Sequence, residues 1–234
     1  QKVLNASQFK EILDAATENT YLWDQEEQRM FNEGRSTDWQ DLITQNGVYQ
    51  NYNLGITGGS EKTTYYLGLD WIDQGIIKNT GYQKGNIRFN LDSKLNNWLT
   101  MGAKFNVIRS STNSSNTDGV AGMNSLDQGT MGSAIASKPS APVFNEDGTY
   151  YDNLLLRPNP VAAVTYFKNN FTQTRINASF NLEAEILKNL KLRTENGMEF
   201  INNQSNVFQD SRMTGIYKNV NISDRENGEQ FYMQ

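Results

Sequence analysis

Apolar and polar residues alternate along the segment from Val48 to Trp71, VYQNYNLGITGGSEKTTYYLGLDW, on both sides of a glycine-rich turn. Successive side chains of a strand project to opposite sides, so this period of two predicts two strands, each with one apolar and one polar face. The turn, Gly58–Lys62, contains the glycines that a tight hairpin requires. The segment therefore predicts an antiparallel hairpin whose apolar face contacts either a protein core or lipid.

The same alternation recurs in four later segments of the chain. They are Ile87–Leu91, Leu99–Val107, Ile176–Ile186 and Leu190–Phe200. Together with the hairpin they predict an all-β fold of about six antiparallel strands. Several of these strands reach about 10 residues, the length at which a tilted strand crosses a bilayer, whereas globular strands average about 5 or 6.

The composition excludes several classes of function. The 234 residues include no Cys and no His, which rules out a thiolate metal site, a cysteine nucleophile and a Ser-His-Asp triad within the chain. The net charge of −5 argues against nucleic acid as a partner, because nucleic-acid sites are basic. The sequence has no apolar run long enough for a membrane-spanning helix. Its mean hydropathy of −0.67 is compatible with a membrane barrel, in which only alternate strand residues must be apolar.

Charge is confined to one face of the predicted strands. The six apolar rows contain no charged residue, and the opposite rows contain Asp70, Arg88, Asp92, Lys104, Arg175, Glu183, Glu185, Lys191, Arg193, Glu195 and Glu199. Lipid enforces such exclusion, since a charge on the lipid face costs roughly 2–4 kcal/mol near the midplane. A soluble β-sandwich would exclude charge from its core face in nearly the same way. A second feature must therefore distinguish a membrane barrel from a soluble sandwich.

The lengths of the connections provide that second feature. Connections 58–62, 96–97 and 188–189 are short, whereas 73–81, 110–172 and the tail after Ile201 are longer. Outer-membrane barrels place short periplasmic turns at one end and long extracellular loops at the other. Aromatic residues near the two ends match the two interfacial belts of such barrels: Tyr65 and Trp98 near the short turns, Trp71 and Tyr82 near the longer loops. In combination these features favour lipid on the apolar face.

The predicted organisation has five parts. Residues 1–47 form an extracellular helical excursion, and residues 48–109 contain barrel strands and hairpins. Residues 110–171 form a long extracellular loop, 172–201 a barrel hairpin, and 202–234 the start of the next extracellular loop. Within the first part, Ser7 is predicted to cap a helix that extends to Ala16.

Several short motifs also stand in an order that resembles one family. They are Asp38–Asp41, Gln50–Leu54, Gly58–Tyr66, Asp73–Ile77, Asn90–Lys94, Asn159–Ala163 and Glu185–Lys191. In order and spacing they are similar to the first part of the barrel in the SusC-like TonB-dependent transporters of the Bacteroidota outer membrane. The resemblance covers nearly the whole chain, and its specificity lies in the combination of motifs.

The resemblance implies a 22-stranded barrel with a plugged lumen, opened by the TonB complex of the inner membrane. It also implies a SusD-like surface lipoprotein as partner and a glycan or peptide as the imported substrate. A plug domain, a TonB-contacting segment and a closing C-terminal strand are not recognisable in this sequence. About six strands cannot close that barrel, and lipid does not tolerate an open sheet edge, so we expect a fragment of a larger polypeptide.

Paired carboxylates raise the question of catalysis. Glu183/Glu185 and Glu195/Glu199 are consistent with glycosidase chemistry, which needs two carboxyl groups about 5 to 9.5 Å apart. Their interleaving with Lys191 favours instead a charge ladder along a wet wall. Residues 116–119 and 145–148 hint at calcium loops but complete no EF-hand pattern. We therefore expect no catalytic residue, no metal site, no cofactor and no enzymatic activity.

Aromatic side chains of the long loop are the candidate substrate contacts, because aromatic rings can stack on sugars. These candidates are Tyr150, Tyr151, Tyr166 and Phe167. Packing of the loop on itself or on the lipoprotein would explain the same residues. The leading hypothesis is part of an active importer of glycans or peptides across the bacterial outer membrane. A soluble β-rich carbohydrate-binding module is the main alternative, and a glycoside hydrolase, supported by the acid pairs alone, is the third.

Overall fold

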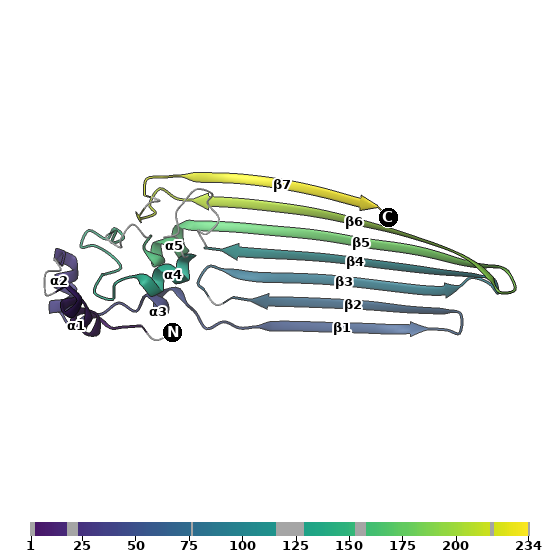
Figure 1. Cartoon of the computed structure of the whole chain (residues 1–234), viewed down its shortest axis with the longest axis horizontal. Coiled ribbons are helices and arrows are strands. Elements are labelled where there is room, and N and C mark those ends of the chain that lie inside the picture. Colours follow the sequence, from purple (N-terminus) through teal and green to yellow (C-terminus); the bar gives the residue numbers. More distant parts are fainter. Residues whose placement is uncertain are drawn as a thin grey trace.

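One antiparallel sheet contains the seven strands found among the described residues, in sequence order from β1 to β7. The computed structural model describes residues 3–17, 23–75, 77–115, 129–152, 158–215 and 218–233. The strands are β1 (Gln50–Gly59), β2 (Thr63–Gln74), β3 (Gly81–Lys94), β4 (Leu99–Ser114), β5 (Phe167–Leu187), β6 (Leu190–Gln209) and β7 (Ile222–Met233). Figure 1 shows them side by side in an up-and-down arrangement. The predicted antiparallel all-β fold is confirmed.

The hairpin at Val48–Trp71 forms as predicted from its alternation. Leu54 lies opposite Leu69, and Tyr52 lies opposite Trp71, so the apolar rows of β1 and β2 share one face. The turn brings the backbone at Gly59 against the strand that follows, and a Cβ atom there would lie 2.3 Å from the Thr63 carbonyl oxygen. Only glycine fits that position without opening the turn.

The strands are more numerous and longer than the sequence predicted. We expected about six strands and assigned 202–234 to a loop, but β6 extends to Gln209 and β7 occupies Ile222–Met233. β4 also continues to Ser114, and β5 already begins at Phe167, both inside the predicted loop 110–171. These extensions are mostly polar, and their few apolar residues, such as Phe171 and Phe208, do not alternate regularly with polar ones, so they lack the pattern on which the prediction depended. Backbone pairing with the neighbouring strand defines them instead.

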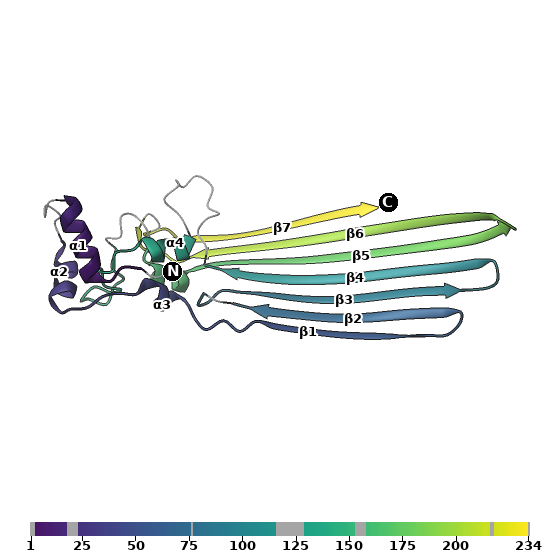
Figure 2. The same cartoon turned by 60° about the horizontal axis from the view of Figure 1, so that its bottom comes forward.

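The helices lie together at one end of the sheet, which we call the helix end (Figures 1 and 2). They are α1 (Ala6–Thr17), α2 (Gln25–Asn32), α3 (Trp39–Ile43), α4 (Gly129–Ala136) and α5 (Pro160–Tyr166). The predicted cap of α1 is wrong: Asn5, not Ser7, accepts the first-turn hydrogen bond, from the Gln8 amide at 2.9 Å. No described helix has the length and apolarity to span a membrane.

The hydrophobic core lies at the helix end and not under the sheet. Trp39, Ile43, Ala134, Ala141, Tyr151 and Val164 form one buried cluster, and Ala163, Phe167 and Met213 form a second. Among the described residues, Phe167 and Ile201 are the only buried hydrophobic side chains that belong to strands. We call the helices and the segments packed with them, 129–152 and 158–166, the loop module. It is the only part of the described chain with a globular core.

Candidate functional site

The apolar face of the sheet is exposed across its whole width. Its central row passes through every strand, each residue directly opposite the next: Leu54, Leu69, Ile87, Val107, Ile176, Phe200 and Phe231. Leu54, Ile87 and Phe231 are 57%, 49% and 57% exposed. An apolar surface of this extent marks an interaction site, and here it is continuous with long strands and charge-free rows. The rows are therefore not the core of a soluble module within the described chain.

The opposite, polar face contains paired charges. Lys191 Nζ lies 2.7 Å from Glu183 Oε1, Arg193 Nη2 lies 3.2 Å from Glu195 Oε2, and Arg175 Nε lies 3.5 Å from a Glu199 oxygen. The first and third contacts link β5 to β6 and the second lies within β6, all on the polar face, in agreement with the predicted charge ladder. Glu183, Glu195 and Glu199 each form an ion pair with a Lys or Arg side chain. Such pairing is expected of a charged barrel wall, whereas catalysis would need an acid and a base free to act on a substrate. The hydrolase hypothesis therefore gains no support.

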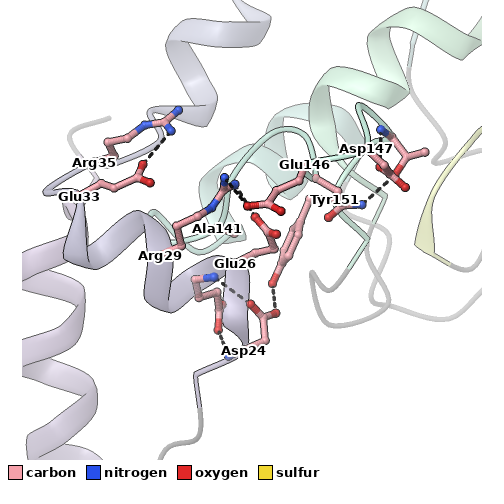
Figure 3. A network of polar contacts seen from close by, with 12 residues as sticks. Asp24, Glu26, Arg29, Glu33, Arg35, Ala141, Glu146, Asp147 and Tyr151 are labelled. Atoms are coloured by element: carbon pink, nitrogen blue, oxygen red, sulfur yellow. Dashed lines mark hydrogen bonds and ion pairs between the residues drawn. The ribbon is translucent and has the colours of Figure 1, made fainter.

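Polar contacts join α2 to the segment 138–151 within the loop module (Figure 3). The Tyr151 hydroxyl donates to Asp24, the N-cap of α2, and Arg29 reaches Glu146 at 3.1 Å. Beside them, Lys138 Nζ lies 2.6 Å from Glu27 Oε1, with side chains only 9% and 1% exposed. A buried ion pair is costly to break from one side, since the remaining charge has no water to solvate it.

The motif that begins at Asp38 has a structural function in this module. Asp38 caps α3 by accepting the amide of Asp41 at 3.1 Å, which directs the next side chain, Trp39, into the core. Trp39 Nε1 donates to the carbonyl oxygen of Lys138 at 2.9 Å. The preceding Thr37 hydroxyl donates to Ala141 O at 2.6 Å. Residues 37–41 thus fasten the first helical segment to the predicted long loop.

Two of the four candidate substrate contacts lie in a surface aromatic cluster. The ring of Tyr150 lies 4.7 Å from that of Phe144 and 5.6 Å from that of Tyr166, the latter edge to face. Arg212 covers Tyr166, with its guanidinium carbon 4.4 Å from the ring centroid. Phe144 is 46% exposed, and Tyr150 and Tyr166 are half-buried. We call these four residues the aromatic cluster; it is open to solvent and able to contact a ligand.

The other two candidates, Tyr151 and Phe167, are buried. Tyr151 is 3% exposed and packs in the first hydrophobic cluster, while Phe167 is 2% exposed and packs in the second, beside Met213. Both side chains pack inside the protein. The sequence left open whether the aromatic residues of the loop contact substrate or pack within the loop, and for these two the structure shows packing. Tyr150 and Tyr151 are sequence neighbours on a small hairpin, bridged at Phe144 and Tyr150, so they point to opposite sides.

Arg212 is held in place by Asp210. Its Nε and Nη2 atoms donate to the two carboxylate oxygens at 2.9 and 2.6 Å. This bidentate pair lowers the pKa of Asp210 to about 2, chiefly through the hydrogen bonds from Arg212, and raises the pKa of Arg212. The cluster therefore presents a fixed, fully charged guanidinium over one of its rings.

Sequence reasoning missed Phe144, Asp210 and Arg212. Arg212 lies far from Tyr166 in the sequence, and the two meet because pairing of β5 with β6 continues as a bond from the Asp210 amide to the Tyr166 carbonyl at 3.2 Å. β6 was predicted to end near Ile201, which placed Arg212 in an unrelated loop. Phe144 could have been found, since alternation across the Asp147–Gly148 turn places it opposite Tyr150.

A cavity of about 620 Å³ opens where the strands meet the loop module. Its lining includes Tyr49, Ile77, Tyr82, Thr130 and Met131. It is mainly apolar and lies between the lead into β1, the β2–β3 connection and α4.

Among the described residues, no group of acidic side chains has the arrangement of a metal site. The possible calcium motif at 116–119 falls outside the described residues, and Asp147 in the other motif accepts from the Thr149 amide and hydroxyl as an ordinary turn.

Known proteins resemble the chain in sequence and in fold. No family model matches it. It is 31% identical to TonB-dependent receptor P26 of Formosa agariphila over 186 residues, which cover 77% of this chain and 18% of that receptor. TonB-dependent receptor P39 of the same organism is 25% identical over 83% of this chain and 18% of its own length. The chain thus spans about a fifth of the length of these relatives, whose names describe receptors and not enzymes.

Solved structures share the fold. The RagAB peptide importer in its closed-closed state superposes with a TM-score of 0.65 and 18% identity, covering 84% of this chain and 22% of the other. Its open-open state gives the same TM-score over 85% and 22%. These structural matches concern the fold alone. The receptor relatives, together with the exposed apolar face, assign the chain as a barrel segment of the TonB-dependent transporters, which are proteins of the bacterial outer membrane, and its ordered motifs resemble those of the SusC-like members.

Proposed function

We propose that the protein containing this chain actively imports glycans or peptides across the outer membrane, with β1–β7 as part of the barrel wall. The observation that carries the proposal is the division of one sheet into an exposed apolar face and a charged polar face. In a barrel, the first face contacts lipid and the second lines the lumen. The receptors and the peptide importer that the chain resembles support import as the activity.

The loop module lies on the extracellular side in this proposal. The connections at the helix end are the long ones, and those at the other end are short, which is the asymmetry of outer-membrane barrels. The described residues before β1 and the segments 129–152 and 158–166 then belong to one extracellular body, because they share the Trp39 core and the contacts around α2. A SusD-like lipoprotein is the partner proposed for this side, and TonB acts through parts of the protein outside this chain.

The aromatic cluster is the proposed substrate contact on this side. Tyr150 and Tyr166 are each partly exposed to solvent, and Arg212 adds hydrogen-bond donors next to them. Rings of this kind stack on sugars or on peptide side chains, and the neighbouring cation favours partners with oxygen acceptors. Burial removes Tyr151 and Phe167 from the proposal.

The test is substrate uptake by cells that express the full-length protein. In a strain lacking the chromosomal copy, wild type, Tyr150→Ala/Tyr166→Ala and the matched control Tyr52→Ala are compared for uptake of labelled oligosaccharide and peptide pools, with and without a functional TonB complex. We expect TonB-dependent uptake of one pool, reduced several-fold by the double variant and unchanged by the control. Uptake of neither pool would contradict import, and equal uptake by all three proteins would contradict the role of the cluster.

A further inference from the structure

The apolar face changes character toward the helix end. Beyond the central row, the same face of β4–β7 carries uncharged hydrogen-bonding side chains, among them Asn170, Thr172, Thr174, Gln204, Asn206 and Asn227. None of the residues at these outward positions is buried, so nothing in the described chain covers them. We call this surface the outer belt. It is continuous with the lipid face, but its chemistry suits hydroxyl-rich partners.

Cations are placed along the outer belt at two levels. Arg109 of β4 is the first outward residue beyond Val107. Lys168 of β5 lies opposite Phe208 of β6, and Arg225 of β7 is a diagonal neighbour of that Phe, about 7–8 Å away. All three cations are exposed, and no ion pair is found for them in the part of the chain that the structure describes. The acid on the same face of β4–β7, Glu229, accepts from Asn202 at 3.2 Å.

The heights of these cations decide between kinds of lipid. With a rise of about 3.3 Å per residue and a tilt of about 40°, Arg109 lies about 5 Å above Val107, the last apolar residue on this face of its strand. By the same estimate, Lys168 lies about 20 Å above Ile176, and Arg225 about 15 Å above Phe231. The polar region of a phospholipid bilayer extends only about 5–8 Å on each side. Arg109 is therefore at phosphate height, whereas Lys168 and Arg225 lie beyond the reach of a phospholipid headgroup.

We propose that the outer belt of β4–β7 binds the phosphorylated oligosaccharide headgroup of an outer-leaflet glycolipid. Arg109 contacts the anionic groups next to the acyl chains, the amide and hydroxyl side chains bond to sugar hydroxyls, and Lys168 and Arg225 bind anionic groups farther along the headgroup. Charge complementarity and continuity with the lipid face support this occupant. The inference rests on the extracellular placement of the helix end in the proposed function.

The test uses the full-length protein purified in mild detergent and mixed with rough lipopolysaccharide, its dephosphorylated form or phosphatidylglycerol. Bound lipid is counted by native mass spectrometry for wild type, Lys168→Gln/Arg225→Gln and Lys168→Arg. The matched control is Arg88→Gln/Lys104→Gln, which removes two cations from the polar face of β3 and β4. Folding is verified by heat-modifiable migration, and Lys168→Gln alone replaces the double variant if that variant does not fold.

We expect the double variant to retain several-fold less lipopolysaccharide than wild type, while Lys168→Arg and the polar-face control retain it fully. Dephosphorylation should cause the same loss in wild type, and phosphatidylglycerol should bind all four proteins equally. Unchanged retention by the double variant, or an equal loss in the control, would overturn the proposal. Substrate uptake measured in parallel separates the two proposals, because loss of lipid with normal uptake leaves the importer function intact.

Discussion

The guanidinium carbon of Arg212 lies 4.4 Å from the centre of the Tyr166 ring, and Asp210 holds it there with two hydrogen bonds. A cation over an exposed ring contributes about 0.5–1 kcal/mol. We therefore expect Arg212→Met to weaken substrate affinity by about two- to fivefold, measured by titration of the full-length protein with its imported substrate. Arg212→Lys should recover part of the loss, because it restores the charge but not the planar fork. An affinity equal to wild type in the Met variant would remove Arg212 from the site.

The ion pair of Asp210 and Arg212 predicts how substrate affinity depends on pH. The folded-state pKa of Asp210 is lowered from 3.8 to about 2 by the hydrogen bonds from Arg212. Because the folded value lies below the unfolded one, the contribution of the pair is complete above about pH 4 and is lost as the pH falls toward 2. Substrate affinity should therefore stay constant from pH 8 to pH 5. Asp210→Asn should show reduced affinity at pH 7, whereas Glu33→Gln, which disturbs only an exposed pair with Arg35, should not.

The buried pair of Glu27 and Lys138 should control the docking of α2. Removing one partner of a buried pair costs about 3–5 kcal/mol, because the other charge stays buried and unpaired. We expect Lys138→Met to speed hydrogen exchange of the α2 amides by at least tenfold, measured by mass spectrometry on the full-length protein. Glu27→Leu/Lys138→Met should restore most of the protection. The control Arg35→Gln breaks an exposed pair worth about 0–1 kcal/mol and should leave exchange unchanged; an equal effect in the control would contradict a special role for the buried pair.

The sheet could be predicted from the sequence wherever lipid imposes a rule on it. A strand with one face in lipid must alternate, so rows such as Ile87–Leu91 identified both the strand and its orientation. β7 could not be found in this way, because Asp224, Arg225 and Glu226 place charge on both of its faces. Beyond the bilayer, backbone pairing and polar side-chain contacts such as Gln173–Asn203 and Asn202–Glu229 maintain the strands, and neither requires apolar and polar residues to alternate.

The candidate site was predicted only in part, because it depends on contacts between distant segments. Tyr150 and Tyr166 were selected from composition, which cannot tell a surface ring from a buried one such as Tyr151. That distinction follows from the hairpin at Phe144 and Tyr150, which turns one tyrosine outward and its neighbour inward. Arg212 entered the cluster through strand pairing that the sequence did not reveal.

Phe89 and Asn90 are neighbours on β3 whose side chains lie on opposite faces of the sheet, so substitutions at the two positions should differ in cost. Phe89 lies on the apolar face between Leu67 and Phe105, whereas Asn90 lies on the polar face between Tyr66 and Lys104. A lysine on the lipid face costs about 2–4 kcal/mol near the midplane. We expect Phe89→Lys to lower the unfolding free energy of the full-length protein in lipid vesicles by at least that amount, because packing is lost as well. Asn90→Gln should change it by less than about 0.5 kcal/mol.

Urea titration followed by tryptophan fluorescence measures both changes, and Phe89→Leu serves as the control for lost ring volume. If Phe89→Lys were no more destabilising than Phe89→Leu, the apolar face would not contact lipid. The assignment of faces would then be wrong for the whole sheet, because the register that joins Phe89 to Phe105 continues through Ala178 and Met198 to the last strand.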